Sequence, residues 1–118
     1  MSRKRLGRGD VVLTRFPFTD LKGAALRPAI VVSEGEIGDD VVLVAISSVV
    51  RGGHVATDLP VGKKHPEFAL TGLRLTSVIR AHKLAAVERS VVVRRIGRTG
   101  PHLQEKLDEL LRRVLSLE

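Results

Sequence analysis

The chain has 118 residues, of which 43% are hydrophobic, a net charge of +7 and no cysteine. This length and composition predict one globular domain over residues 1–118, and the lack of cysteine excludes disulfides, thiolate nucleophiles and cysteine zinc sites. No apolar run approaches the roughly 20 residues of a membrane span, and the basic N-terminus lacks the apolar stretch of a signal peptide. We therefore expect a cytoplasmic protein with no membrane partner.

Short strands separated by turns are predicted for the first half of the chain. Residues 1–8 form a basic N-terminal arm, and residues 9–16 (GDVVLTRF) mix β-branched residues with alternation, as strands do. Residues 17–28 contain two prolines, Asp20 and a glycine, which predicts a long loop. Strands follow at 29–33 and 41–48, and the second of these is apolar on both faces, which is typical of a central strand.

The middle of the chain is predicted to be mostly loop. Residues 51–57 contain a Gly-Gly pair that permits unusual backbone angles. Residues 57–61 indicate a weak edge strand, because Pro60 cannot donate a ladder hydrogen bond. Residues 62–68 are predicted as a further loop.

The last third is predicted to contain two or three strands and one helix. Strands are expected at 75–80 and 90–97, whereas 83–88 is compatible with a strand or a short helix. Residues 101–117 carry an apolar stripe at helical spacing, starting after Pro101, which suits a first helical turn. The stripe consists of Leu103, Leu107, Leu110, Leu111, Val114 and Leu115.

Many short strands followed by one helix, without strand–helix alternation, argue against a doubly wound parallel sheet. The pattern predicts a mainly β fold, in which a small closed or strongly bent barrel carries a docked C-terminal helix.

The positive charge is unevenly distributed and rich in arginine. Residues 34–50 carry a net charge of −4, whereas residues 1–33 carry +5 and residues 51–100 carry +7. Arginine outnumbers lysine fourteen to six, and guanidinium groups match phosphate well. The balance favours a polyanionic partner such as nucleic acid, with solubility alone as the alternative.

Several common site motifs are absent. Gly62-Lys63 lacks the upstream glycine and the Ser/Thr of a P-loop. The four histidines, His54, His65, His82 and His102, do not have the spacing of metal ligands. We therefore expect neither a metal nor another cofactor.

Three segments in order resemble the PemK/MazF toxins of type II toxin–antitoxin systems. They are GDVVLTRFPFTDLKGAALRPAIVVS (9–33), VVLVAISS (41–48) and LTSVIRAHKLAAVERSVVVRRIG (75–97). The resemblance implies an SH3-like small β-barrel of the CcdB/PemK/MazF type. It also implies a metal-independent endoribonuclease that cuts single-stranded RNA, acts as a homodimer and is silenced by a cognate antitoxin protein.

The resemblance assigns a role to particular residues. RNA cleavage by its own 2′-hydroxyl, which leaves a 2′,3′-cyclic phosphate and a 5′-hydroxyl, needs a base, a cation at the phosphate and a proton for the leaving oxygen. Arg27 matches the arginine of the family's Arg-Pro motif and is expected to stabilise the phosphate. Ser47 is expected to hydrogen-bond it, and Arg80 to act as an acid or a second phosphate clamp.

His82 stands where an acidic residue is more common in the PemK branch, so it is either the base or an exposed strand residue. Further contacts with RNA are expected from Phe18, Thr19, Lys22, Ser48 and Ser77. Ser48 also replaces Ser47 if the register is shifted by one residue. Arg94, Arg95 and Arg98 are compatible with either a groove wall or an ordinary surface.

Two other functions remain open for this fold. CcdB shares the barrel but poisons DNA gyrase through the end of its helix, and the tail SLE lacks the aromatic residue expected for that role. The second alternative is an RNA-binding barrel without catalytic activity, which the departure at His82 leaves open.

Overall fold

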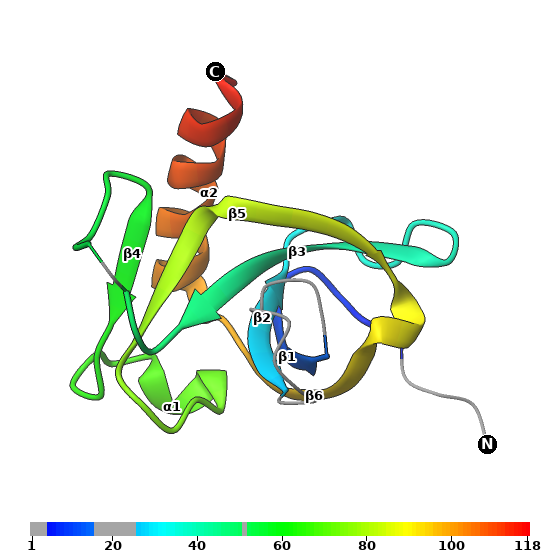
Figure 1. Cartoon of the computed structure of the whole chain (residues 1–118), viewed down its shortest axis with the longest axis horizontal. Coiled ribbons are helices and arrows are strands. Elements are labelled where there is room, and N and C mark those ends of the chain that lie inside the picture. The colour runs from blue at the N-terminus through cyan, green and yellow to red at the C-terminus, as the bar shows by residue number, and fades with distance from the viewer. Residues whose placement is uncertain (1–4, 16–25, 51) are drawn as a thin grey trace.

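The computed structural model describes residues 5–15, 26–50 and 52–118 (Figure 1). The strands are β1 (Asp10–Thr14), β2 (Arg27–Val31), β3 (Asp40–Ser47), β4 (Asp58–Val61), β5 (Ser77–Glu88) and β6 (Val92–Arg98). The helices are α1 (Phe68–Thr71), α2 (Pro101–Leu115) and a single 3₁₀ turn, η1 (Arg89–Val91). No helix among these residues is long and apolar enough to cross a membrane.

All six strands belong to one antiparallel sheet with the order β4-β5-β3-β2-β1-β6. β5 arches over the sheet and turns through η1 into β6, so the sheet is strongly curved (Figure 1). No pairing among the described residues joins the outer strands β4 and β6, so the curved sheet stays open. The predicted mainly β fold with a C-terminal helix is confirmed, with the bent form of the barrel rather than the closed one.

The positions of individual strands follow the sequence patterns closely. β3 lies inside the sheet, between β5 and β2, as its apolar faces predict. β4 lies at the edge, where the missing N–H of Pro60 is tolerated. The segment 90–97 forms a strand only from Val92 onward, because η1 occupies its beginning.

The ambiguous segment 83–88 is a strand, and it continues β5 without interruption. Ala45 of β3 pairs with Arg80, but the preceding Val44 pairs with Leu84, so residues 81–83 form a bulge in β5. A bulge shifts the side-chain alternation and re-aims side chains next to it. Arg80 and Lys83 consequently reach the same side of the sheet, where they line one pocket.

The two faces of the sheet bury two separate apolar clusters. One cluster lies under α2 and contains Val11, Ile30, Val32, Val44, Ile46, Val61, Ile79, Ala81, Leu103 and Leu107. The other fills the inside of the curved sheet and contains Leu6, Val12, Ala29, Val31, Val41, Leu43, Val87 and Val92. Successive residues of β2 alternate between the clusters, which explains why the run AIVV is apolar throughout.

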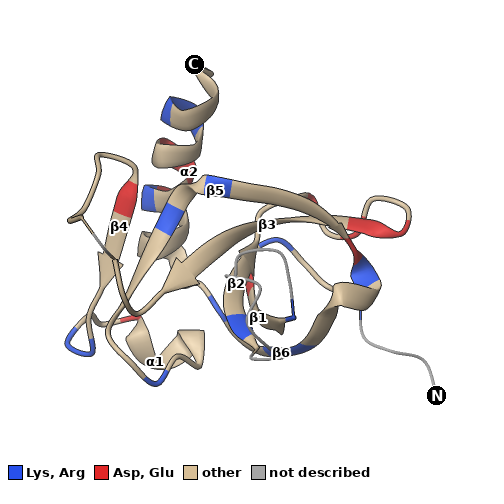
Figure 2. Ribbon diagram, in the orientation of Figure 1, with Lys and Arg blue, Asp and Glu red and all other residues tan. Residues whose placement is uncertain are grey.

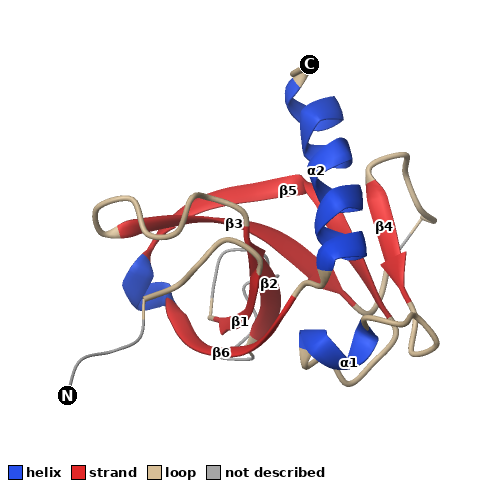
Figure 3. Ribbon diagram, turned by 180° about the vertical axis from the view of Figure 1, so that it is seen from behind, coloured by secondary structure: helices blue, strands red, loops and turns tan. Residues whose placement is uncertain are grey.

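Helix α2 packs across the back of the sheet (Figure 3). Its predicted stripe is confirmed from Leu103 to Val114, but Leu115 is exposed. The helix ends at Leu115, two residues before the predicted end, because Ser116 adopts the left-handed conformation with φ 54°.

The first turn of α2 is capped by a side chain from another element. Gly100, the residue before the helix, offers no side chain, and the carboxylate of Glu67 accepts the N–H groups of His102 and Leu103 at 2.9 and 2.8 Å. Burial opposes the charge, but these two hydrogen bonds and the neighbouring His102 and His65 outweigh it and lower the pKa of Glu67. Glu67 therefore ties the segment before α1 to the N-terminus of α2.

Helix α1 was not predicted, since residues 62–68 were expected to be loop and 69–74 carried no assignment. It ends at Gly72, whose φ of 74° favours glycine. It also lies directly on β6, where a Cβ added at Gly97 would be 2.4 Å from the carbonyl oxygens of Leu70 and Thr71. The backbones of α1 and β6 can approach this closely only because residue 97 has no side chain.

The described part of the basic N-terminal segment packs against the sheet. Leu6 is buried in the inner cluster, and its N–H donates to the carboxylate of Glu36 at 2.9 Å. Arg8 bonds the carbonyl of Val32 and the carboxylate of Asp108 on α2. Residues 5–8 thus join the two sides of the fold rather than extend from it.

Candidate active site

A pocket of about 880 Å³ opens where β2, β3 and β5 meet the segment between α1 and β5. Its lining consists of Leu13, Arg27, Pro28, Ala45, Ile46, Ser47, Ser48, Val49, Gly72, Leu73, Arg74, Leu75, Ser77, Arg80, Lys83, Arg94 and Ile96. These residues come from five strands and two connecting segments, so only the folded sheet assembles the pocket.

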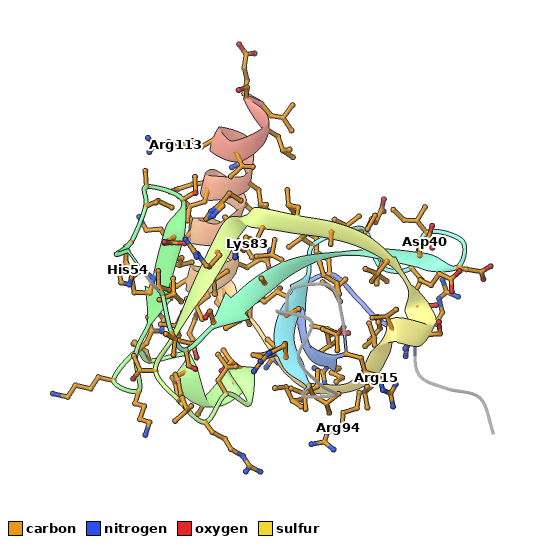
Figure 4. The ribbon with its side chains drawn as sticks, in the orientation of Figure 1. Arg15, Asp40, His54, Lys83, Arg94 and Arg113 are labelled. Atoms are coloured by element: carbon orange, nitrogen blue, oxygen red, sulfur yellow. The ribbon has the colours of Figure 1, made fainter. Side chains whose placement is uncertain are left out.

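The pocket lining is strongly cationic. Five of the residues are positively charged, namely Arg27, Arg74, Arg80, Lys83 and Arg94, and no described acidic residue belongs to the lining. Figure 2 marks cationic positions on β2, β5 and β6, the strands that carry four of these residues, and Figure 4 labels Lys83 and Arg94. Arg80 has a counter-charge in Asp58 behind the lining, but the excess of cations in one concave surface still attracts a polyanion.

Arg27 is the first residue of β2 and pairs with Thr14 across the sheet. Its side chain is exposed, and it forms no ion pair with a described residue. Pro28 restricts the backbone directly after it, and the next residue, Ala29, is fully buried between β1 and β3. The core therefore anchors the strand, while the guanidinium remains available to a ligand.

Arg80 is held by a carboxylate from the neighbouring strand. Its Nε lies 2.9 Å from Oδ1 of Asp58, and its Nη2 lies 3.4 Å from Oδ2. The side chain of Asp58 is completely buried, and that of Arg80 is 15% exposed. Burial disfavours the charged carboxylate, but the N–H of Val55, the guanidinium of Arg80 and the neighbouring His82 outweigh this effect and lower the pKa of Asp58.

The three serines of the pocket differ in what their hydroxyl groups can do. Ser47 donates to the carbonyl of Val49 at 2.5 Å and accepts the N–H of the same residue at 3.1 Å. Ser77 is buried and donates to the carbonyl of Leu75 at 2.7 Å. A hydroxyl has one donor hydrogen, so both of these donors are in use, whereas Ser48 is exposed.

His82 lies on β5 but is not part of the pocket lining. Its side chain is exposed, and Nδ1 lies 2.9 Å from the hydroxyl oxygen of Thr57. It thus stands in the bulge beside the pocket, near the end of loop 52–57.

The structure brings five of the predicted site residues together, namely Arg27, Ser47, Ser48, Ser77 and Arg80. Phe18, Thr19 and Lys22 lie outside the described residues. Of the three undecided arginines, Arg94 lines the pocket, Arg95 pairs with Asp10 at 2.8 Å, and Arg98 lies elsewhere.

Two pocket cations were missed by the sequence analysis. Arg74 lies in the segment 69–74, for which no secondary structure was predicted. Lys83 lies in the segment 83–88, which was compatible with a strand or a short helix. No local motif marks either residue, because the bulge and α1 bring them to the pocket.

In the described residues, no group of three or more His, Asp or Glu side chains could hold a metal ion.

Comparisons with known proteins give a consistent result. The sequence model of the family described as "PemK-like, MazF-like toxin of type II toxin-antitoxin system" matches residues 7–115. No curated protein matches at a significant level.

Several solved structures share the fold along nearly their whole length. An endoribonuclease in complex with its cognate antitoxin from mycobacterial species is 22% identical, with a TM-score of 0.70 over 96% of this chain and 97% of that one. The toxin MazF-mt6 of Mycobacterium tuberculosis is 19% identical, with a TM-score of 0.68 over 92% and 98%. A chain of a MazE–MazF crystal structure (Form-II) from Deinococcus radiodurans is 14% identical, with a TM-score of 0.74 over 98% of this chain and 100% of that one.

Proposed function

The chain belongs to the PemK-like, MazF-like toxins of type II toxin–antitoxin systems, and from this premise we propose that it is an endoribonuclease that cuts single-stranded RNA in the pocket between β2, β3 and β5. The observation that carries the proposal is the group of five cations in one pocket, with no described acid among the lining residues. RNA supplies the polyanion and also the nucleophile, its 2′-hydroxyl. The protein therefore needs to supply mainly electrostatic stabilisation and proton transfer.

The proposed reaction is an in-line attack of the 2′-hydroxyl on the adjacent phosphorus. The 2′-oxygen bonds to phosphorus as its proton passes to a base, the bond from phosphorus to the 5′-oxygen breaks, and the leaving oxygen takes a proton from water, which leaves a 2′,3′-cyclic phosphate and a 5′-hydroxyl. Negative charge grows on the phosphate oxygens during attack, and fixed guanidinium groups stabilise it without a metal ion. Arg27 and Arg80 are the two arginines that approach from opposite sides of β3, and we assign the scissile phosphate to the space between them.

The serines have separate roles in this proposal. Ser48, with its exposed hydroxyl, is the hydrogen-bond donor to RNA. Ser47 could donate to a phosphate only by giving up its bond to the carbonyl of Val49, so it shapes the turn that presents Ser48. Ser77 likewise fixes the local backbone through Leu75.

The residues that transfer protons are a separate question from those that bind the phosphate. A guanidinium stays protonated in proteins, and Arg80 is also bound to a carboxylate, so we assign Arg80 to phosphate stabilisation rather than to proton donation. His82 remains the predicted base, and it would have to turn from Thr57 toward the pocket to act. If it does, His82→Ala lowers the rate of RNA cleavage.

We also propose a cognate antitoxin as the protein partner and a homodimer as the working form, in the cytoplasm. Two large apolar side chains, Val49 and Leu75, are 66% and 59% exposed at the cationic pocket. An acidic segment with interspersed apolar residues would match both features and would compete with RNA. A binding assay in which the antitoxin displaces RNA from the wild-type protein checks that the two partners share this pocket.

Cleavage of a long unstructured RNA in EDTA tests the proposed function. Wild type, Arg27→Ala and the control Arg113→Ala are compared, because Arg113 is an exposed cation on α2 that does not belong to the pocket. The 5′ ends of the products are mapped. We expect discrete cuts with 5′-hydroxyl ends for wild type and Arg113→Ala, and a rate lower by roughly 10²–10³ for Arg27→Ala, which is the usual effect of losing one transition-state donor.

If RNA stays intact after incubation with the folded, antitoxin-free wild type, the proposed function is wrong. Binding of RNA without cleavage would then assign the chain to the RNA-binding barrels. Equal rates for Arg27→Ala and Arg113→Ala would instead show that cleavage takes place away from this pocket.

A further inference from the structure

Asp58 and Arg80 are directly opposite each other on the neighbouring strands β4 and β5. Directly opposed residues project from the same face of a sheet. Their side chains meet along one edge of the guanidinium, where Nε and Nη2 donate to the two carboxylate oxygens. Asp58 also accepts the N–H of Val55 through Oδ2 at 2.9 Å, so the carboxylate is itself fixed by the loop before β4.

The way in which Arg80 is held leaves a defined part of it available. A guanidinium has five N–H groups, and the pair with Asp58 uses one on Nε and one on Nη2. Of the three that remain, one N–H on Nη1 and one on Nη2 form a second fork at the tip, which can bind two oxygens of a phosphate. The side chain is 15% exposed and lines the pocket, so this fork is reachable from there.

We propose that Asp58 is a positioning residue, which holds Arg80 by its side edge so that its outer fork faces the phosphate of the bound RNA. This inference rests on the proposed function and extends it to a residue outside the pocket lining. The carboxylate comes from the edge strand β4, from the position directly opposite Arg80 on β5. The fully buried carboxylate therefore shapes the active site without touching the substrate.

The opposing interpretation is that Asp58 only stabilises the fold, by joining β4 to β5 and by fixing the turn at Val55. In that case its loss would lower stability but would leave the turnover of the folded protein unchanged. The two interpretations differ in how the losses of kcat from substituting Asp58 and Arg80 combine. If Asp58 acts only by positioning Arg80, its substitution has no further effect on kcat once Arg80 is absent.

The test compares wild type, Asp58→Asn, Arg80→Ala and the double variant, at a temperature and pH where urea titration shows that each is folded. Asp10→Asn is the matched control. Asp10 also pairs with an arginine, Arg95, at 2.8 Å, and also accepts a backbone N–H, that of Gly7, at 2.7 Å. Neither Asp10 nor Arg95 lines the pocket.

We expect Asp58→Asn to lower kcat by about 10- to 100-fold, since misplacement of a group by about 1 Å can have that effect, with KM changed less than threefold. Arg80→Ala is expected to lower kcat by about 10²–10³, and the double variant is expected to equal Arg80→Ala within about threefold. Asp10→Asn should retain the wild-type kcat. Asp58→Asn with wild-type kcat, or a double variant in which the two losses multiply, overturns the inference.

Failure of the proposed function gives a different result from failure of this inference. If the wild type leaves RNA intact, the same variants are measured for binding to a single-stranded DNA oligonucleotide, which carries the phosphates but no 2′-hydroxyl. Weaker binding by Asp58→Asn that disappears in the Arg80→Ala background supports the positioning role. Unchanged binding by Asp58→Asn overturns it.

Discussion

Replacement of Gly97 by alanine tests whether the close contact between α1 and β6 determines the shape of the pocket. The added Cβ would lie 2.4 Å from the carbonyl oxygens of Leu70 and Thr71, which is 0.6 Å closer than the 3.0 Å that real Cβ atoms respect. These oxygens belong to the backbone and cannot rotate away, so α1 must move. The segment that follows α1 contributes four residues, 72–75, to the pocket wall, and it must move with the helix.

The expected loss of stability for Gly97→Ala is about 2–3 kcal/mol, at the upper end of the usual cost of overpacking. For a chain of this length, that loss corresponds to a decrease in Tm of roughly 8–12 °C. Urea titration and thermal unfolding followed by circular dichroism measure it. The folded fraction of the variant is also expected to cleave RNA more slowly than the wild type.

Gly62→Ala is the matched control for this substitution. No atom lies within 4 Å of a Cβ built at Gly62, and its φ is outside the left-handed region. This variant is expected to be neutral or more stable by up to about 1 kcal/mol, because alanine restricts the unfolded chain. If the free energy of unfolding of Gly97→Ala lies within about 0.5 kcal/mol of the wild-type value, α1 and β6 are not in the contact described, and the reasoning fails.

Three further predictions follow from the core, the helix cap and the pocket. Leu107→Ala should lower the free energy of unfolding by about 2–5 kcal/mol, since Leu107 is fully buried under the sheet, whereas the exposed Leu117→Ala should change it by less than about 0.5 kcal/mol in the same urea titration. The pKa of Glu67 is lowered below its usual 4.5, so its stabilising contribution is present above that pH and is lost as the pH falls through the folded-state pKa. Tm should therefore decrease less between pH 5 and 3 for Glu67→Gln than for the wild type, and parallel curves would refute the cap. Finally, the salt dependence of RNA binding should weaken by about 0.7 in log–log slope for Arg94→Ala, and Arg113→Ala, outside the pocket, should keep the wild-type slope.

The apolar pattern of the strands was sufficient to predict most of the sheet. The run at 29–33 predicts a strand because four apolar residues follow one another, and its first three residues lie in β2, which begins two residues earlier at Arg27. The stripe that begins at Leu103 predicted α2, because 3.6-residue periodicity depends only on local spacing. Pro60 predicted an edge strand, because its backbone has no N–H to donate to a second neighbouring strand, and β4 lies at the edge of the sheet.

Elements that depend on distant partners could not be predicted in the same way. Helix α1 is only four residues long, and isolated helices of that length are not stable in water. It forms where Gly97 lets it approach β6 and where Glu67, just before it, caps α2. The neighbouring sequence contains no periodic pattern that would reveal these contacts.

The sequence by itself determined most of the strands, the terminal helix and the family, because each of these depends on residue types at fixed local spacing. Only the tertiary structure decided which cations share a pocket, since Arg74, Lys83 and Arg94 reach it through a missed helix, a bulge and the far edge of the sheet. It also decided that Asp58 holds Arg80, a contact between residues 22 positions apart in the chain. Strand register brings these groups together, and register is set by how the whole sheet buries its apolar faces rather than by the residues beside them.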